Sequence, residues 1–291
     1  MTAAAEVLNV AQPALGLQIR NLEEELEVPL LIRHSRGVQP TPAGEFLAKR
    51  AATILRSFDD LQKDLQSFVE VSRETIRFGI TPSAMLLLGS NMILQAQDLM
   101  PKAFFSLVEE LSFLLINALE AGELDAAFTY QRSNAPNLLH RAIMQEDVLL
   151  VTSPDIDPSC EPIRFEEAIR RDLVLAGQRD IIRQLVEEMA ARKSKDVNVV
   201  YEAQSVAATR NLLTGGIASG IMPYGSIAAE LESGLLRGRR IVDPPVTRTL
   251  YLVTQQRSVP IQSEAELTQF LESAIVLMTE RLGDYCRPID Q

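Results

Sequence analysis

Residues 12–26 read QPALGLQIRNLEEEL, the pattern of an amphipathic helix that begins after a tight turn. Pro13 suits the first turn of such a helix, where a missing N–H group costs no hydrogen bond. Apolar side chains then recur at steps of three and four residues, which predicts one buried face: Leu15, Ile19, Leu22 and Leu26. Pro29 follows and predicts the end of the helix.

The flanking residues predict a helix before this one and a β-hairpin after it. Residues 2–9 are good helix formers behind an N-capping threonine. Residues 30–40 favour two short strands around a basic turn, and Thr41 caps the next helix. This order is typical of a winged helix-turn-helix and predicts that residues 1–42 bind DNA through the second helix. An ordinary helical hairpin has a similar layout and is the alternative.

Composition is that of a soluble globular protein, with 291 residues, 46% hydrophobic and 23% charged. No apolar run is long enough to span a membrane, the N-terminus lacks the pattern of a signal peptide, and two distant cysteines suit a reducing compartment. We therefore expect a cytoplasmic protein. The net charge is −11, and acidic side chains outnumber basic ones even within residues 1–66. DNA binding must therefore depend on a few placed side chains.

Two stretches resemble the LysR-type transcriptional regulators: AAEVLNVAQPALGLQIRNLEEEL at residues 4–26, and PLLIR at 29–33 with TPAG at 41–44. The resemblance implies that DNA faces these residues: Gln12, Pro13, Gly16, Gln18, Arg33 and Arg36. Gly16 stands where family members often have serine, so one hydroxyl contact is absent. Simpler alternatives are that Gln18 is merely exposed and that Arg33 pairs with Glu23 or Glu27.

Family members normally begin with a further helix ahead of the position of Thr2. The resemblance therefore implies that this chain lacks a helix that supports the other two. An alternative function follows, in which a truncated regulator dimerises and binds its effector but no longer binds DNA.

Residues 43–70 predict a long helix with a coiled-coil seam. Apolar side chains recur every seven residues in two sets that are offset by four: Leu47, Ile54, Leu61 and Phe68, with Ala51, Phe58 and Leu65. Such a stripe needs a partner, which favours a homodimer, although packing on the chain's own core is the alternative. The resemblance also implies that this helix dimerises the protein. Two further assemblies are implied by the same resemblance: a homotetramer, and a complex with RNA polymerase.

From residue 75 onward, strands alternate with helices, including a helix at 84–98 and a strand at 147–152, which predicts α/β units. The resemblance implies two α/β subdomains of the periplasmic-binding-protein type. The expected organisation is a winged helix-turn-helix at 1–42, a linker helix at 43–71 and an effector-binding domain at 75–291. Within that domain, the first subdomain comprises about 75–152 plus 248–291, and the second about 153–247.

Ligands in such sheets bind beyond the carboxyl ends of strands, at helix N-termini. Polar residues at these positions predict a site for a small anionic effector: Thr81, Ser83, Ser112, Thr129, Gln204 and Ser205. For each residue alone, simple N-capping is the alternative.

The sequence favours no enzymatic activity, cofactor or metal. The two histidines, His34 and His140, have no second ligand at a metal-binding spacing. Glu109 and Glu110 are adjacent in a predicted strand, so their side chains point to opposite faces. A solute-binding protein is a further alternative, but it requires secretion.

Overall fold

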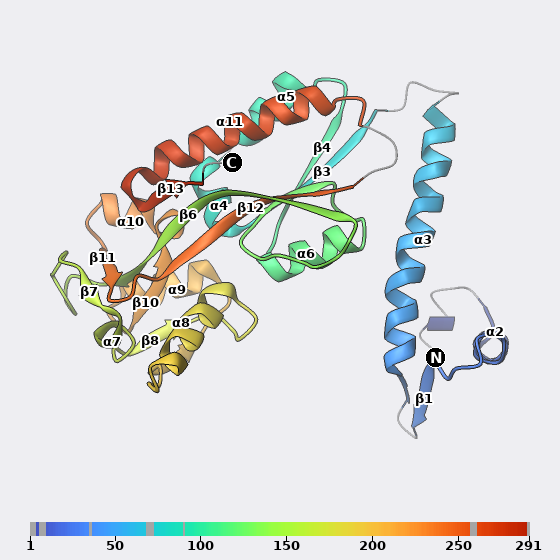
Figure 1. Ribbon diagram of the computed structural model, residues 1–291, viewed down its shortest axis with the longest axis horizontal. Helices are drawn as coiled ribbons and strands as arrows, with labels where there is room; N and C mark the ends of the chain where they lie inside the picture. The colour runs from blue at the N-terminus through green and yellow to red at the C-terminus, as the bar shows by residue number, and fades with distance from the viewer. Residues whose placement is uncertain are drawn as a thin grey trace. The chain divides into compact units, whose positions relative to one another are not determined.

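The computed structural model describes residues 4–5, 10–34, 37–67, 73–89, 91–256 and 261–289 (Figure 1). The chain divides into two compact units, Met1–Ser72 and Arg73–Gln291. Among the helices of these described ranges, none has the length and hydropathy needed to cross a membrane.

The first unit contains the predicted second helix and hairpin. Helix α2 spans Gln12–Glu25, with the proline in its first turn and Leu15 buried. Strand β1 (Leu31–His34) pairs antiparallel with β2 (Gly37–Pro40). The positions of the helix and the hairpin are therefore confirmed. The predicted buried face is not, because only Leu15 is buried, whereas Leu22 and Leu26 are exposed. Of the helix expected at residues 2–9, the structure describes only Ala4 and Ala5, and both are helical.

Two polar side chains join α2 to the hairpin and to the next helix, α3 (Pro42–Ser67). The Glu23 carboxylate accepts the backbone N–H groups of Leu30 (2.7 Å) and Leu31 (2.9 Å). The Thr41 hydroxyl accepts the N–H of Gly44 at 3.0 Å, and so caps α3 as predicted, while donating to the carbonyl of Pro29 at 2.7 Å. These bonds hold the chain on both sides of the hairpin.

Helix α3 leaves part of the predicted seam exposed. Ile54 is 69% and Phe58 56% exposed, whereas Leu47 and Ala51 are half-buried. The helix ends at Ser67, and the expected residues 68–70 lie outside the described part of the chain. The side chains of Leu61 and Leu65 and the whole of Phe68 also lie outside it.

The second unit is built on one long mixed sheet whose main strand order is β4-β3-β5-β12-β6-β10-β8-β9. Its strands have these bounds: β3 Thr75–Ile80, β4 Phe104–Glu109, β5 Ala126–Thr129, β6 Leu138–Thr152, β7 Ile163–Arg164, β8 Leu173–Leu175, β9 Val199–Glu202, β10 Ser219–Pro223, β11 Arg237–Val242, β12 Thr247–Gln255 and β13 Cys286–Pro288.

Helices cover both halves of this sheet, and α5 lies beside α11 (Figure 1). Their bounds are these: α4 Pro82–Leu88, α5 Asn91–Leu99, α6 Ser112–Glu120, α7 Phe165–Ala168, α8 Ile181–Arg192, α9 Val206–Thr214, α10 Ala228–Glu232 and α11 Glu264–Leu282, with 3₁₀ turns η1 Tyr224–Ser226 and η2 Gly283–Tyr285. The single helix expected at 84–98 is therefore wrong. Two helices occupy this region because Gly89, at φ +60°, ends α4.

Strand β6 passes from one subdomain to the other. Its residues 138–147 pair with β12, and Val148–Val151 pair with β10 on the far side. Parallel strands β3, β4 and β5 lie in one half, and β8, β9 and β10 in the other. Each half has its own hydrophobic core, one around Phe78 and the other around Phe165. The strand expected at 147–152 is thus only the second half of β6.

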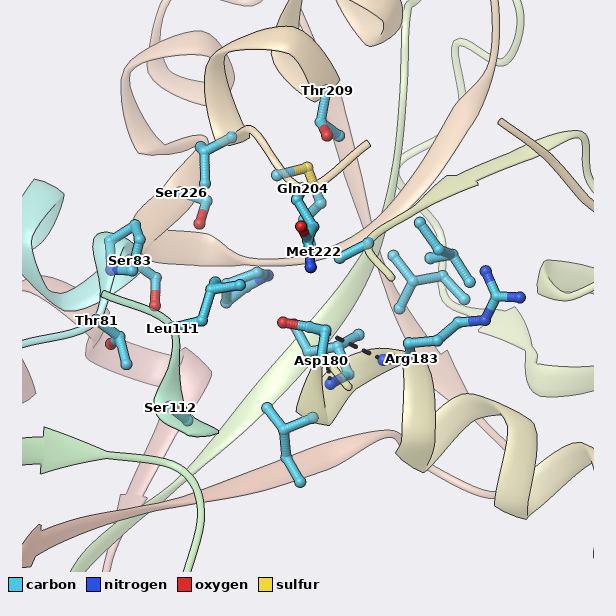
Figure 2. A pocket seen from close by; sticks show the side chains of 18 of the residues that line it. Thr81, Ser83, Leu111, Ser112, Asp180, Arg183, Gln204, Thr209, Met222 and Ser226 are labelled. Atoms are coloured by element: carbon cyan, nitrogen blue, oxygen red, sulfur yellow. Dashed lines mark hydrogen bonds between the residues drawn. The ribbon is translucent and has the colours of Figure 1, made fainter. Parts of the chain in front are cut away.

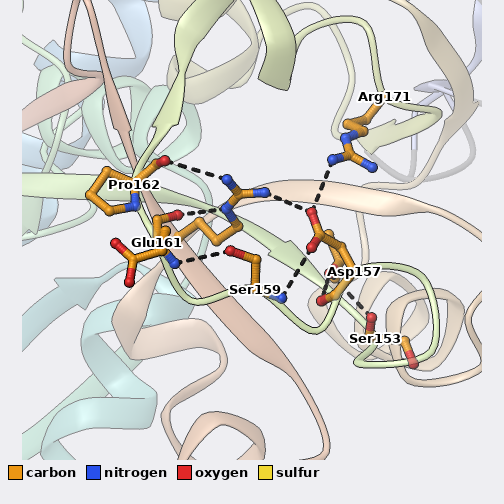
Figure 3. A network of polar contacts seen from close by, with 8 residues as sticks. Ser153, Asp157, Ser159, Glu161, Pro162 and Arg171 are labelled. Carbon is orange, nitrogen blue, oxygen red and sulfur yellow. Dashed lines mark hydrogen bonds and ion pairs between the residues drawn. The ribbon is translucent and has the colours of Figure 1, made fainter.

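A polar network holds the loop that follows β6 against β11 (Figure 3). Arg239 donates through Nη1 to Asp157 Oδ2 (2.6 Å) and through Nε to the carbonyl of Glu161 (2.6 Å). Arg171 donates to the same Asp157 oxygen at 2.9 Å, and the N–H of Ser159 donates to Oδ1 at 3.0 Å. Burial alone would raise the pKa of the Asp157 carboxyl, but these hydrogen bonds and charges lower it.

Candidate functional site

A cavity of about 90 Å³ lies between the two subdomains (Figure 2). Residues after β3 and β4 line one side of it, and residues from β8 to β10 and their connections line the other. This is the place where ligands bind in α/β sheets, because carboxyl ends of strands and N-termini of helices meet there.

Most of the predicted effector residues meet in this cavity. Thr81, Ser83, Ser112 and Gln204 line it. Thr129 is fully buried outside the lining, where its hydroxyl accepts the N–H of Gln131 at 3.2 Å. Ser205 is also outside the lining and accepts the N–H of Ala208 at 3.2 Å, so it acts as the N-cap of α9. For Ser205, this geometry matches the N-cap alternative.

The hydroxyl groups on the first side of the cavity belong to helix starts. Thr81 occupies the N-cap position of α4, but its side chain makes no capping bond. Its Oγ1 atom is buried and has no hydrogen-bond partner among the described residues. Ser112 begins α6, whose N-cap residue, Leu111, supplies no side-chain acceptor. Buried polar atoms are normally hydrogen-bonded, so this side of the cavity is suited to a polar ligand.

Asp180 contributes a carboxylate to the opposite side of the cavity. It is the N-cap of α8, and its Oδ1 atom accepts the N–H groups of Ile182 (2.9 Å) and Arg183 (3.3 Å). Sequence reasoning did not select this residue as part of the site. The available signal was an aspartate just ahead of an apolar helical run, which also fits a simple cap.

A buried ion pair lies beside the cavity, within the first subdomain. Arg248 lines the cavity and donates through Nε to Glu146 Oε2 at 2.9 Å and through Nη2 to the Ser83 hydroxyl at 2.8 Å. The Tyr130 hydroxyl donates to the same Glu146 oxygen at 2.7 Å. The guanidinium also lies over the Tyr130 ring, 3.5 Å from its centroid. The cluster thereby joins α4, β6, β12 and Tyr130, the residue that follows β5.

Burial and charge define the protonation states in this cluster. Burial raises the pKa of Tyr130 above its ordinary value, so its hydroxyl stays protonated and donates. Burial alone would lower the pKa of Arg248, but the adjacent Glu146 carboxylate raises it above the ordinary value. The sequence could not reveal the pair, because Glu146 and Arg248 lie on different strands, far apart in the chain.

The candidate DNA-contacting residues of α2 are accessible. Gln12, Pro13 and Gln18 are exposed, and Gly16 is half-buried. The backbone of Arg33 lies in β1, but its side chain and the whole of Arg36 lie outside the described residues. Whether Arg33 instead pairs with an acidic neighbour therefore stays a prediction.

Two family models match the chain along most of its length. Residues 1–45 match the bacterial regulatory helix-turn-helix protein, lysR family, and residues 70–275 match the LysR substrate binding domain. The chain belongs to the LysR family. Its helix-turn-helix segment and its α/β unit are therefore the DNA-binding and effector-binding parts of a LysR-family transcriptional regulator.

Among curated relatives, the chain is 29% identical over 273 residues to the HTH-type transcriptional regulator BbuR of Bordetella bronchiseptica, a match that covers 94% of this chain and 84% of the relative. It is also 29% identical over 269 residues to the nitrogen assimilation regulatory protein nac of Klebsiella aerogenes, covering 91% and 87%. Both relatives are named as regulators.

Solved structures show the same fold. A variant of OxyR from Corynebacterium glutamicum superposes with a TM-score of 0.63 at 24% identity, covering 97% of this chain and 87% of that one. Full-length CbnR in complex with its target DNA superposes with a TM-score of 0.60 at 19% identity, covering 94% and 93%. The expected fold class, a helix-turn-helix followed by a substrate-binding domain of mixed α/β type, is confirmed.

Proposed function

We propose that this chain is a cytoplasmic transcription regulator that binds double-stranded DNA as a homodimer and responds to a small effector that carries an anionic group. The observation that carries the proposal is the cavity between the subdomains. It contains a buried hydroxyl, Thr81 Oγ1, that has no partner among the described residues, beside the uncapped N-terminus of α6. A helix N-terminus favours negative charge through its dipole and its free N–H groups.

The cavity also supports a means of control. Its walls come from both subdomains, so a ligand inside contacts both at once. A ligand that binds one arrangement of the subdomains more tightly than another shifts the population toward that arrangement. The effector would act in this way on the spacing of the two DNA-binding segments in a dimer.

On the DNA side, the exposed face of α2 supports recognition through Gln12 and Gln18, with Pro13 and Gly16 beside them. Glutamine side chains hydrogen-bond base edges in the major groove. Two copies joined through α3 would present two such helices to a palindromic site. Assembly of dimers into a tetramer, and contact with RNA polymerase, are further parts of this proposal.

The test is a gel-shift measurement with the full-length protein and DNA from its own promoter region, at low salt, with and without small molecules extracted from the cell. We expect a specific complex whose affinity changes when the extract is added. The double change Gln12→Ala and Gln18→Ala should weaken specific binding by about 1–3 kcal/mol for each lost base contact. Gln97→Ala, the same change on an exposed residue of α5, should leave binding unchanged.

Failure of the protein to shift any of this DNA, with or without extract, would overturn the proposal. If such a protein still dimerised and bound small molecules, that result would support the alternative of a regulator that no longer binds DNA.

A further inference from the structure

We infer that the effector, in the function proposed above, is a zwitterion of the amino-acid type, with its anionic group at the α6 N-terminus beside Thr81 and its protonated amine at Asp180. The inference depends on the two sides of the cavity having opposite character. It also depends on each side coming from a different subdomain.

The size of the cavity limits the ligand to a small molecule. Its volume is about 90 Å³. Roughly 10–15 Å³ of such space is enough to admit one water molecule, so the cavity has room for a small ligand. A small amino acid is a ligand of this kind.

The first side of the cavity suits an anionic group. The N-terminus of α6 carries no side-chain cap, and its first residue, Ser112, lines the cavity. The Ser112 Oγ atom already accepts the N–H of Tyr130 at 3.1 Å, so its hydroxyl hydrogen remains available to a ligand oxygen. Thr81 is only 4% exposed and lines the same side, and its buried Oγ1 has no hydrogen-bond partner among the described residues. In the described part of the chain, no protein group accepts a hydrogen bond from the Thr81 hydroxyl.

The second side suits a protonated amine. Asp180 lies across the cavity from Thr81 and Ser112 in Figure 2. Within the described part of the chain its carboxylate takes part in no side-chain ion pair, since the groups that donate to it are the backbone N–H groups of α8. Arg248 interacts with this carboxylate through its charge alone, so a ligand ammonium group would be the first cation hydrogen-bonded to it among the described residues.

The two arginines of the cavity do not reverse this balance. Arg248 is paired with Glu146, and Arg183 donates to Glu187. Glu146 and Glu187, which lie outside the lining, balance these two guanidinium groups, so Asp180 is an additional negative charge at the cavity. A ligand with only negative charge would meet this excess, whereas a zwitterion places its ammonium against it.

A dipolar ligand also explains why both ends of the cavity are polar. The anionic end of the ligand would contact the first subdomain, and its amine would contact the second. The ligand would therefore link the two subdomains only if it carries both groups. The structure therefore predicts discrimination against molecules of the same size that lack one of the two charges.

The experiment is isothermal titration of the full-length protein with the smaller free amino acids, each compared with its 2-hydroxy acid and its amide. L-Alanine, L-lactate and L-alaninamide form such a series, because they are nearly equal in size. We expect at least one amino acid to bind saturably. Its hydroxy acid and its amide should each bind at least about tenfold more weakly, as expected for loss of one charge-assisted hydrogen bond.

Two variants test the assignment of the ends. Asp180→Asn keeps the size and capping ability of the side chain but removes its charge, so the preference for the amino acid over its hydroxy acid should disappear. Thr81→Val should weaken binding of the amino acid and the hydroxy acid alike. Glu188→Gln removes an exposed carboxylate from α8, the helix that Asp180 caps. This control should change neither the affinity for the amino acid nor its preference over the hydroxy acid. If Asp180→Asn fails to fold by circular dichroism, Asp180→Ser replaces it.

The inference is wrong if the hydroxy acid binds the unaltered protein as tightly as the amino acid, if Asp180→Asn keeps the preference, or if no member of any series binds. Each of these results leaves the proposed function open to its own gel-shift test. Conversely, a protein that binds an amino acid as expected but shifts no DNA would overturn the proposed function and leave this inference standing.

Discussion

Glu146 is the buried residue at the centre of the polar cluster beside the cavity. It is fully buried and accepts hydrogen bonds from Arg248 and Tyr130. Glu146→Gln would leave the Arg248 charge buried without a counter-charge, and breaking such a pair costs about 3–5 kcal/mol. We expect the free energy of unfolding, measured in urea, to fall by about that amount.

A matched control is the exposed pair on α8, in which Arg192 lies 3.9 Å from Glu188. Glu188→Gln should cost less than about 1 kcal/mol, because water screens the pair. Equal losses in the two variants would contradict the role assigned to Glu146.

Asp157 gives the stability of the second subdomain a dependence on pH. Its pKa is lowered from 3.8 in the folded protein, so the unfolded chain binds the proton more readily. The stabilisation is therefore present above 3.8 and is lost as pH falls through the lower folded value. Asp157→Asn should lower the free energy of unfolding at pH 7, and its deficit relative to the unaltered protein should shrink as pH falls below 3.8.

Urea titrations of both proteins from pH 7 down to about 3 would measure this difference. A deficit that stays constant over this range would show that the Asp157 charge contributes nothing.

At the scale of elements, α3 tests the predicted dimer. Ile54 and Phe58 are exposed on the seam, and Leu55 is 64% exposed beside it but off the seam. The double change Ile54→Asp and Phe58→Asp places charges in the proposed interface, so the protein should become monomeric in analytical ultracentrifugation. Leu55→Asp should remain dimeric. Dissociation by Leu55→Asp alone, or a dimer that survives the double change, would contradict pairing through this seam.

Local sequence patterns predicted the helices and strands that depend on contacts between residues close together in the sequence. Helix α2, the hairpin and the Thr41 cap all depend on contacts within a few residues, and each was found where expected. Strand β11 and the first half of β6 were missed. Both contain several charged side chains, for example Arg239 and Arg141, which conceal the alternation that marks a strand.

The candidate site also contains residues that local patterns could predict and residues that they could not. The hydroxyl side of the cavity could be predicted, because residues such as Thr81 and Ser112 directly follow a strand and begin a helix. Glu146 and Arg248 could not, because they meet only when β6 and β12 pair. Register between distant strands depends on the packing of the whole sheet and leaves no local signal.

At the scale of the whole molecule, the two units differ in how much core they contain. The described hydrophobic core clusters all belong to residues 73–291, and so do the cavity and its buried ion pair. In the first unit, by contrast, α2 buries Leu15 while Leu22 and Leu26 remain exposed. The second unit should therefore fold by itself. The first unit should depend on contacts beyond itself, such as those with a second copy of the chain through α3.

A fragment of residues 73–291 provides the test. We expect it to unfold cooperatively on heating, because a unit of this size with its own core folds independently. It should bind the same small molecules as the full chain with an affinity within about threefold, since the cavity lies wholly inside it. The same fragment should fail to shift promoter DNA, because it lacks α2. Circular dichroism and isothermal titration measure the first two properties. A fragment that melts without cooperativity, or a folded one that has lost ligand binding, would show that the first unit helps to form the cavity.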